Sequence, residues 1–280
     1  STRYQFQPKR PLTLELFSDP SNYAVRTVGL PGLAALGVTF GQVVTGRSPA
    51  QGDFNWGPMI WHELSHVFAI QLSKSRVPRW FTEGLSEWET TNLHPEWVRR
   101  THAELYAALR AGTLLSIADL NVGFTRARDV AHIVVAYHEA ACAIDFLIRK
   151  LGFGKIVEAL RLFGQGMRTR EVLTKISGQS IEELDRAFRA DLEQKLSAYK
   201  GTIFVRPSDY SDLDALEKAI HEKPRDARLH AVLAIGLVRS GAAAQEAARI
   251  QTELAEALRL DARCGEALLG EGELLLKQGK

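Results

Sequence analysis

Two histidines and a glutamate have the spacing of a metal-dependent hydrolytic site. They occur in the run His62-Glu63-Leu64-Ser65-His66. On a helix, residues four apart share a face, so both imidazoles can reach one ion. Neutral imidazole is a good zinc ligand, and a carboxylate beside it can take a proton from zinc-bound water. We therefore predict Zn²⁺ as the cofactor, His62 and His66 as its ligands and Glu63 as the general base.

Two further carboxylates follow in the run from Trp80 to Glu87. The stretch between His66 and Glu83 is long enough for a helix end, a turn and the start of a new helix. Glu83 and Glu87 share a face of this largely apolar helix, where carboxylates need partners. We predict Glu83 as the third ligand and Glu87 as the hydrogen-bond acceptor of a zinc-bound histidine. Glu89 is expected in solvent. The alternative is an exposed acidic face.

These two motifs together, HELSH and WFTEGLSE, resemble the gluzincin metallopeptidases, the group that contains thermolysin and the membrane-alanyl-type aminopeptidases. The chain is more similar still to bacterial peptidase MA-like proteins, often fused to tetratricopeptide repeats, over residues 11–199. The resemblance implies a small β lobe with an antiparallel edge strand beside the zinc helix, and a helical lobe. It also implies that substrate backbone pairs with that edge. Residues 37–45 are our candidate for the edge strand.

The same resemblance implies a Tyr or His that stabilises the oxyanion during hydrolysis. Tyr137 matches a family segment that runs over residues 136–166, and His138 and His132 are the alternatives. The chain lacks the aminopeptidases' exopeptidase motif, which favours endopeptidase action. The stretch from His66 to Glu83 is also slightly shorter than in those two better-known families.

The elements that must position these residues form an α+β pattern. Alternating or β-branched residues predict strands, and helical spacing of apolar residues predicts helices. Strands are predicted over residues 12–17, 25–28 and 37–45. Helices are predicted over residues 59–73, 79–90, 95–111, 131–151, 155–163 and 181–199.

The composition of the sequence changes near residue 200, and this change divides the chain into two parts. We predict a metallopeptidase domain over residues 1–200, a linker over 201–211 and an all-α segment of helical hairpins over 212–280. An internal repeat marks the last segment, in which small or turn residues recur at a constant interval; Ala219, Pro224 and Gly241 correspond to Ala257, Ala262 and Gly279. The segment resembles tetratricopeptide repeats and is a possible site for a protein partner.

The composition is that of a globular protein. The chain has 280 residues, 45% of them hydrophobic, and a net charge of +2 that does not favour a nucleic-acid partner. No apolar run is long enough to predict a transmembrane segment. Cys142 and Cys264 are expected to be buried thiols and not a disulfide. The chain begins at Ser1 without a signal-peptide pattern, which suggests a processed piece and leaves the compartment open.

The leading hypothesis is zinc-dependent hydrolysis of peptide bonds in a peptide or protein substrate. The alternative is an inactive peptide-binding scaffold in which the helical repeats act alone. The intact set of His62, Glu63, His66 and Glu83 argues against the alternative, because a decayed enzyme has no need of all four. Hydrolysis of a non-peptide amide is a third hypothesis that the sequence does not separate from the first.

Overall fold

The computed structural model forms two compact units, Ser1–Ala198 and Tyr199–Lys280. It describes residues 3–29, 35–51, 54–97, 102–127, 130–200, 205, 207–241 and 244–279. No helix within these ranges has both the length and the apolar character needed to cross a membrane. Cys142 and Cys264 are buried free thiols, as predicted.

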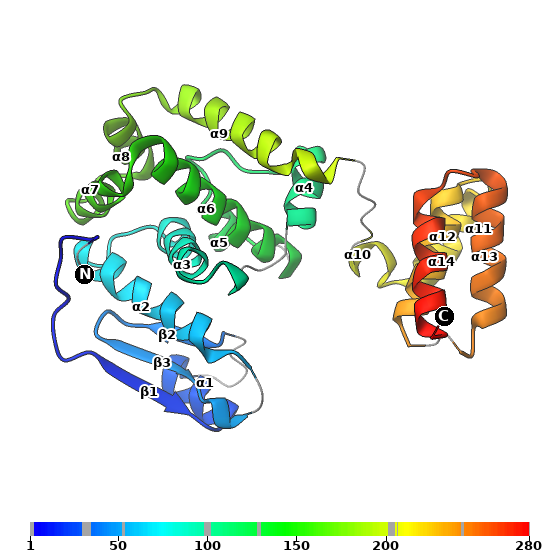
Figure 1. Cartoon of the computed structure of the whole chain (residues 1–280), viewed down its shortest axis with the longest axis horizontal. Helices are drawn as coiled ribbons and strands as arrows, with labels where there is room; N and C mark the ends of the chain where they lie inside the picture. Colours follow the sequence, from blue (N-terminus) through cyan, green and yellow to red (C-terminus); the bar gives the residue numbers. More distant parts are fainter. Residues whose placement is uncertain are drawn as a thin grey trace. The chain divides into compact units, whose positions relative to one another are not determined.

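A small mixed sheet opens the first unit (Figure 1). Its strands are β1 (Thr13–Phe17), β2 (Gly37–Thr39) and β3 (Val43–Arg47), in the order β1-β3-β2. The pairing of β2 with β3 is antiparallel, whereas β1 runs parallel to β3. The expected antiparallel lobe is thus wrong for β1, because a helix between the first two strands returns the chain before the sheet continues.

Two predicted strands differ in the structure. The strand predicted at residues 25–28 is wrong, because these residues end helix α1 (Pro20–Val28). The side chain of Asp19 caps this helix, Pro20 occupies its first turn, and Gly29 ends it with a left-handed φ of 76°. The single strand predicted at 37–45 is instead a hairpin of β2 and β3, with Gly41 at φ 78° in its turn.

Helices α2 and α3 follow the sheet along the chain. Helix α2 (Trp56–Leu72) is capped at its start by Asn55, whose side chain accepts a hydrogen bond from the backbone N–H of Gly57. Helix α3 (Arg79–Leu93) begins after Pro78, which stands in extended conformation. Between them, Lys74 and Ser75 adopt positive φ in a tight turn. Helix α2 contacts both β2 and α3, so it lies between the sheet and the rest of the helices.

The helices that follow α3 in the first unit lie on the side of α2 and α3 away from the sheet (Figure 1). The longest of them, α6 (Val130–Leu151), contacts α3, α4, α5, α7 and α9. The shorter helices around it are α4 (His102–Arg110), α5 (Val122–Thr125), α7 (Phe153–Gly164), α8 (Thr169–Ser177) and α9 (Ile181–Leu196). Short 3-10 turns occur at Pro49–Gln51, Pro95–Trp97 and Ser197–Tyr199.

The sequence prediction missed helices α5 and α8. It also placed one helix over residues 95–111, where the structure has a 3-10 turn followed by α4, and residues 98–101 lie outside the described ranges. Both missed helices are short, and α5 has a single turn, so neither carries enough periodic apolar residues to be recognised.

The second unit consists of helices around its own apolar core. After the short α10 (Pro207–Tyr210) come α11 (Leu213–Glu222), α12 (Ala227–Arg239), α13 (Ala247–Leu260) and α14 (Gly265–Lys277). Helix α12 is buried along most of its length and contacts the other helices of the unit. The C-terminal ends of α11 and α12 recur, at one and the same sequence interval, as those of α13 and α14. Residues 201–204 and 206 of the predicted linker lie outside the described ranges.

Candidate metal centre

Helix α2 presents His62 and His66 side by side. They are one helical turn apart, and their ring centroids lie 4.8 Å from each other with the rings nearly perpendicular. The hairpin of β2 and β3 covers one side of this helix and α3 the other. The helix is apolar for most of its length and packs against α3. Its two histidines lie at this interface, where the side chain of His62 is 14% exposed and that of His66 is 10% exposed.

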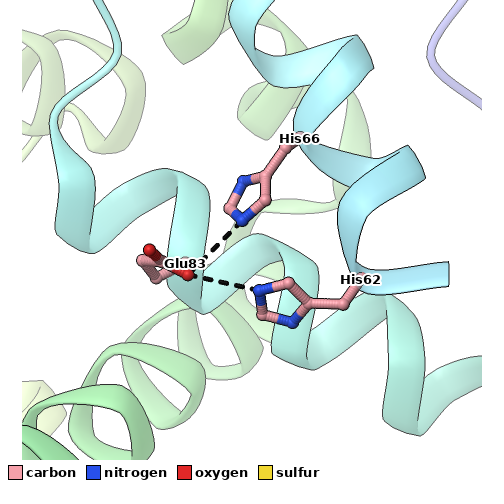
Figure 2. A group of neighbouring side chains, drawn as sticks. All are labelled: His62, His66 and Glu83. Atoms are coloured by element: carbon pink, nitrogen blue, oxygen red, sulfur yellow. Dashed lines mark hydrogen bonds and ion pairs between the residues drawn. The ribbon is translucent and has the colours of Figure 1, made fainter. Parts of the chain in front are cut away.

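Helix α3 brings Glu83 to both imidazoles. Figure 2 shows the carboxylate pointing from α3 between the two rings on α2. Its Oε2 atom lies 3.2 Å from Nε2 of His62 and 3.4 Å from Nε2 of His66. One potential ligand atom from each of the three residues lies within 4.8 Å of the others. Among the described residues, this is the group of histidine, cysteine and acidic side chains with metal-binding spacing.

The second nitrogen of each ring has its own partner on α3. Nδ1 of His62 lies 3.4 Å from Oε1 of Glu87, the residue predicted to orient a histidine. Nδ1 of His66 lies 2.7 Å from the hydroxyl of Thr82 and 3.2 Å from that of Ser86. Sequence reasoning missed Thr82 and Ser86, although their positions beside Glu83 on the same helix offered a signal. These contacts hold the Nε2 atoms of both rings toward Glu83.

The charges at the centre are strongly coupled. Burial alone would lower the pKa of His62, but hydrogen bonds to Glu83 and Glu87 raise it to about 10. Burial likewise disfavours the charged form of Glu83, yet hydrogen bonds to His62 and His66 hold the pKa of this carboxyl well below its usual range. The two carboxylates therefore require positive charge between the helices, which either a protonated imidazole or a cation can supply.

Glu63 lies on a different face of α2, toward the sheet. Its carboxylate is buried, and Oε2 accepts a hydrogen bond of 2.7 Å from the hydroxyl of Thr39 on β2. A Cβ atom at Gly37 would lie only 2.6 Å from Cγ of Glu63, so this position on β2 leaves the room that the glutamate occupies. The edge strand of the sheet therefore fixes where the candidate base lies.

Helix α6 places Tyr137 against the ligand glutamate. Its hydroxyl lies close enough to Glu83 and Arg79 for them to shift its pKa, and its ring packs edge-on against Phe124 at 5.1 Å. Burial and the charge of Glu83 raise the pKa of Tyr137 to about 12, so the hydroxyl keeps its proton at neutral pH. This makes it a hydrogen-bond donor beside the centre.

The two alternatives to Tyr137 differ from it in their surroundings. His138 packs edge-on against His102 of α4 at 4.7 Å, and burial and the proximity of His102 lower its pKa to about 4. His138 thus faces α4 and a cavity of about 240 Å³ that the two histidines of α2 do not line. His132 lies near the start of the same helix and is half-buried.

Glu89 is not in solvent as expected. It is buried, and its carboxylate accepts hydrogen bonds from Tyr4 at 2.9 Å and Arg3 at 3.1 Å. The ring of Tyr4 stacks on Phe68 of α2, so Tyr4 contacts both α2 and α3. The expectation is wrong because both partners of Glu89 lie near the start of the chain, far from it in the sequence.

The residues present fit a divalent transition metal. Two imidazole nitrogens and one carboxylate oxygen are the donor set of many catalytic zinc sites, which keep a fourth position for water or substrate. His66 and Glu83 are buried and His62 is half-buried, the three donors converge, and the nitrogens not used for ligation already have partners on α3. His62, His66 and Glu83 would hold the ion, while Glu63 lies outside this group.

Comparison with known proteins places the chain in a family. A sequence profile described as the peptidase MA superfamily matches residues 5–194, which includes the sheet, α2, α3 and most of the helical lobe. No curated protein and no solved structure matches the chain. The match supports a gluzincin-like peptidase domain and points to metal-dependent peptidase activity. Since it covers well over half of the sequence, the chain belongs to the peptidase MA superfamily.

Proposed function

We propose that this protein is a zinc-dependent endopeptidase that hydrolyses peptide bonds at the α2–α3 centre. One observation carries the proposal: Nε2 of His62, Nε2 of His66 and Oε2 of Glu83 converge between two helices of a peptidase MA domain. The donor set is that of catalytic zinc sites with two histidines and a glutamate.

The chemistry divides between the ion and the protein. When bound, zinc acts as a Lewis acid and brings the pKa of water close to neutrality. Glu63 acts as the general base: its carboxylate accepts a proton from the attacking water and returns it to the leaving amine. The hydrogen bond from Thr39 keeps one oxygen of Glu63 engaged, so the other oxygen is the one that moves the proton.

Tyr137 has the second chemical role in this proposal. As water attacks the peptide carbonyl, negative charge builds on the carbonyl oxygen. A hydroxyl that stays protonated at neutral pH can donate a hydrogen bond to that oxygen as the charge develops. The proximity of Tyr137 to Glu83 and its pKa of about 12 support this assignment over His138, whose ring packs against His102.

The edge strand supports an extended peptide as the substrate. Strand β2 stands at the edge of the sheet and contacts α2, close to Glu63. A substrate backbone that pairs with such an edge places a peptide bond beside the helix and leaves both chain ends free to extend. This geometry, with no exopeptidase motif in the sequence, favours cleavage within a chain.

The second unit is proposed to be a tetratricopeptide-like array that contacts a protein partner or the substrate. The regular recurrence of helix ends, from Glu222 to Leu260 and from Arg239 to Lys277, supports the array. Close packing between helices supports it further: Cβ atoms at Gly236 and Gly270 would approach Leu213 and Leu254 to 2.7 Å.

The test compares the full chain with its Glu63→Gln variant. Zinc is measured per chain after purification, and cleavage is measured on peptide libraries blocked at both ends. We expect one zinc per chain in both proteins and cleavage of internal bonds only by the parent. Glutamine keeps the size of the side chain but cannot accept the proton, so the metal site stays intact.

Other results would count against the proposal in distinct ways. Failure of the parent to bind zinc after reconstitution would refute the metal centre. Zinc binding with no cleavage of peptides or proteins would favour the scaffold alternative. Equal cleavage by the parent and Glu63→Gln would show that Glu63 is not the general base.

A further inference from the structure

The two carboxylate oxygens of Glu83 have different partners. Oε2 faces both histidines, at 3.2 Å from His62 and 3.4 Å from His66. Oε1 lies 3.3 Å from Nε of Arg79, one helical turn earlier on α3. The carboxylate therefore directs one oxygen at the metal centre and the other at a guanidinium.

Arg79 is itself held in place by residues from other helices. Its guanidinium lies close enough to the hydroxyl of Tyr137 on α6 to interact with it electrostatically. It also lies over the ring of Phe124 on α5, with its central carbon 5.8 Å from the ring centroid. Phe124 and Tyr137 also pack against each other, so the two neighbours of the guanidinium hold each other in place. Such contacts orient the planar guanidinium even though the side chain is 53% exposed.

An ordinary ion pair one turn apart on a helix surface would have little effect, because solvent screens both charges. This pair differs, since the side chain of Glu83 is only 10% exposed and the arginine is fixed by Tyr137 and Phe124. The effect of the contact is therefore to fix the orientation of the Glu83 carboxylate. A guanidinium that donates to Oε1 competes with a metal for that oxygen, so the contact favours ligation through Oε2 alone.

The number of donor oxygens decides what else a metal can bind. With one oxygen from Glu83, the centre supplies three donor atoms and leaves a tetrahedral ion one open position. With both oxygens, that position is taken. We propose that Arg79 is a positioning residue that holds Glu83 as a one-oxygen ligand and so keeps a coordination position open for substrate chemistry. This inference rests on the proposed metal-dependent function.

The experiment measures metal binding without relying on activity. Zn²⁺ affinity is determined by competition with a chromophoric chelator, and Co²⁺-loaded protein is examined by visible absorption, whose intensity falls as coordination number rises above four. The proteins are the full-length parent, Arg79→Ala, Arg79→Gln and Arg79→Lys. Arg161→Ala, which removes an exposed arginine from α7, is the control for net charge.

We expect Arg79→Ala and Arg79→Gln to weaken Zn²⁺ binding by about tenfold, the usual effect of losing a partner of a metal ligand. We also expect their Co²⁺ absorption to weaken as the freed oxygen joins the ion. Arg79→Lys keeps the charge without the planar fork and should fall between them and the parent. Arg161→Ala should match the parent.

Two results would overturn the inference, and they are distinguishable. If the parent binds one metal and both Arg79→Ala and Arg79→Gln keep its affinity and its Co²⁺ spectrum, Arg79 does not position Glu83. If the parent binds no metal, the proposed function itself fails and the inference with it. Arg79→Gln retains much of the side-chain volume, so it also gives a result should Arg79→Ala fold poorly.

Discussion

The hydroxyl of Thr39 links the sheet to the candidate base at the scale of single residues. It lies 2.7 Å from Oε2 of Glu63 and 2.9 Å from the backbone oxygen of the same residue. A hydroxyl has one proton, so it donates to one of these oxygens at a time, and the two positions keep it beside Glu63. Because β2 is an edge strand of the sheet, this contact makes the orientation of Glu63 depend on how β2 meets α2.

We predict that Thr39→Val lowers kcat by about tenfold, because a tenfold rate change corresponds to about 1.4 kcal/mol, close to the value of one hydrogen bond. KM and bound zinc should change little, since the hydroxyl of Thr39 is hydrogen-bonded to Glu63 and not to the proposed ligands. Steady-state kinetics on a blocked peptide and metal analysis provide the measurement. Thr39→Ser, which keeps the hydroxyl, should recover most of the rate. A parental kcat in Thr39→Val would show that the hydroxyl is not needed to hold Glu63.

Glu139 of α6 should make stability depend on pH. Burial raises its pKa to about 8; Arg189 and a backbone hydrogen bond from Leu115 oppose this effect, and the like charge of Asp185 adds to it. Between the usual value of 4.5 and about 8, the folded state keeps a proton that the unfolded state has lost. Stability therefore falls as pH rises through this window.

We predict that Glu139→Gln removes this dependence. The parent should lose on the order of 3 kcal/mol more than the variant between pH 5 and pH 8. The measurement is urea denaturation at several pH values with a metal chelator present in every sample, so that metal binding does not contribute. Parallel stability curves for the two proteins would show that the buried carboxyl is not neutral in the folded state.

Which site residues can be anticipated from the sequence depends on the range of the contacts. His62, His66 and Glu83 can be named because helical spacing and a short turn are local properties. Thr39 and Arg79 cannot, because their roles arise only when β2 and α6 pack against α2 and α3. The same holds for the partners of Glu89, which come from the first residues of the chain. Arg79 in particular looks like any polar residue at the start of a helix.

At the scale of elements, the contact between α3 and α6 decides where Glu83 lies. Gly84 follows Glu83, and a Cβ at this position would lie 2.5 Å from the backbone oxygen of Ala140 on α6. Backbone cannot rotate away as a side chain can, so a larger residue must move one helix relative to the other. The glycine beside the ligand is therefore part of what sets the distance between the helices.

We predict that Gly84→Ala destabilises the first unit by about 1–3 kcal/mol, the usual cost of overpacking, and weakens zinc binding at the same time. Gly154 in α7 provides the matched control, because a Cβ there meets nothing within 4 Å. Gly154→Ala should be neutral or stabilising by up to about 1 kcal/mol through helix propensity. Chemical denaturation and chelator competition measure the two effects. Parental stability and affinity in Gly84→Ala would mean that α3 and α6 can separate freely.

The elements themselves are predictable to different degrees. Long helices such as α2 and α6 carry several turns of apolar spacing, and the structure has helices there. Where α1 forms, the sequence favours a turn and a strand, because Asp19 and Pro20 suit a turn as well as a helix start. The hairpin at residues 37–47 resembles one strand in the sequence because Gly41 is an isolated glycine within a β-branched run.

At the scale of the whole molecule, the chain contains two units that each bury their own apolar residues. In the second unit, a cluster that includes Ile235, Ile250 and Leu254 is almost fully buried. In the first, Phe81 makes edge-to-face contacts with its neighbour Trp80 on α3 and with Phe163 on α7, and all three rings are buried. A separate core in each unit is the condition for separate unfolding transitions.

We therefore predict that metal removal affects one transition only. Zinc present at about a thousand times its dissociation constant would stabilise the first unit by about 4 kcal/mol. For a unit of this size the corresponding loss on chelation is on the order of 10 °C in Tm. Calorimetry of the full chain should show the transition of the first unit falling with chelator, while that of the helical unit stays in place. Glu83→Gln, which lacks one proposed ligand, should begin near the chelated value and respond little. A shift of both transitions together would mean that the ion, or the contacts it orders, stabilises the chain as a single cooperative structure.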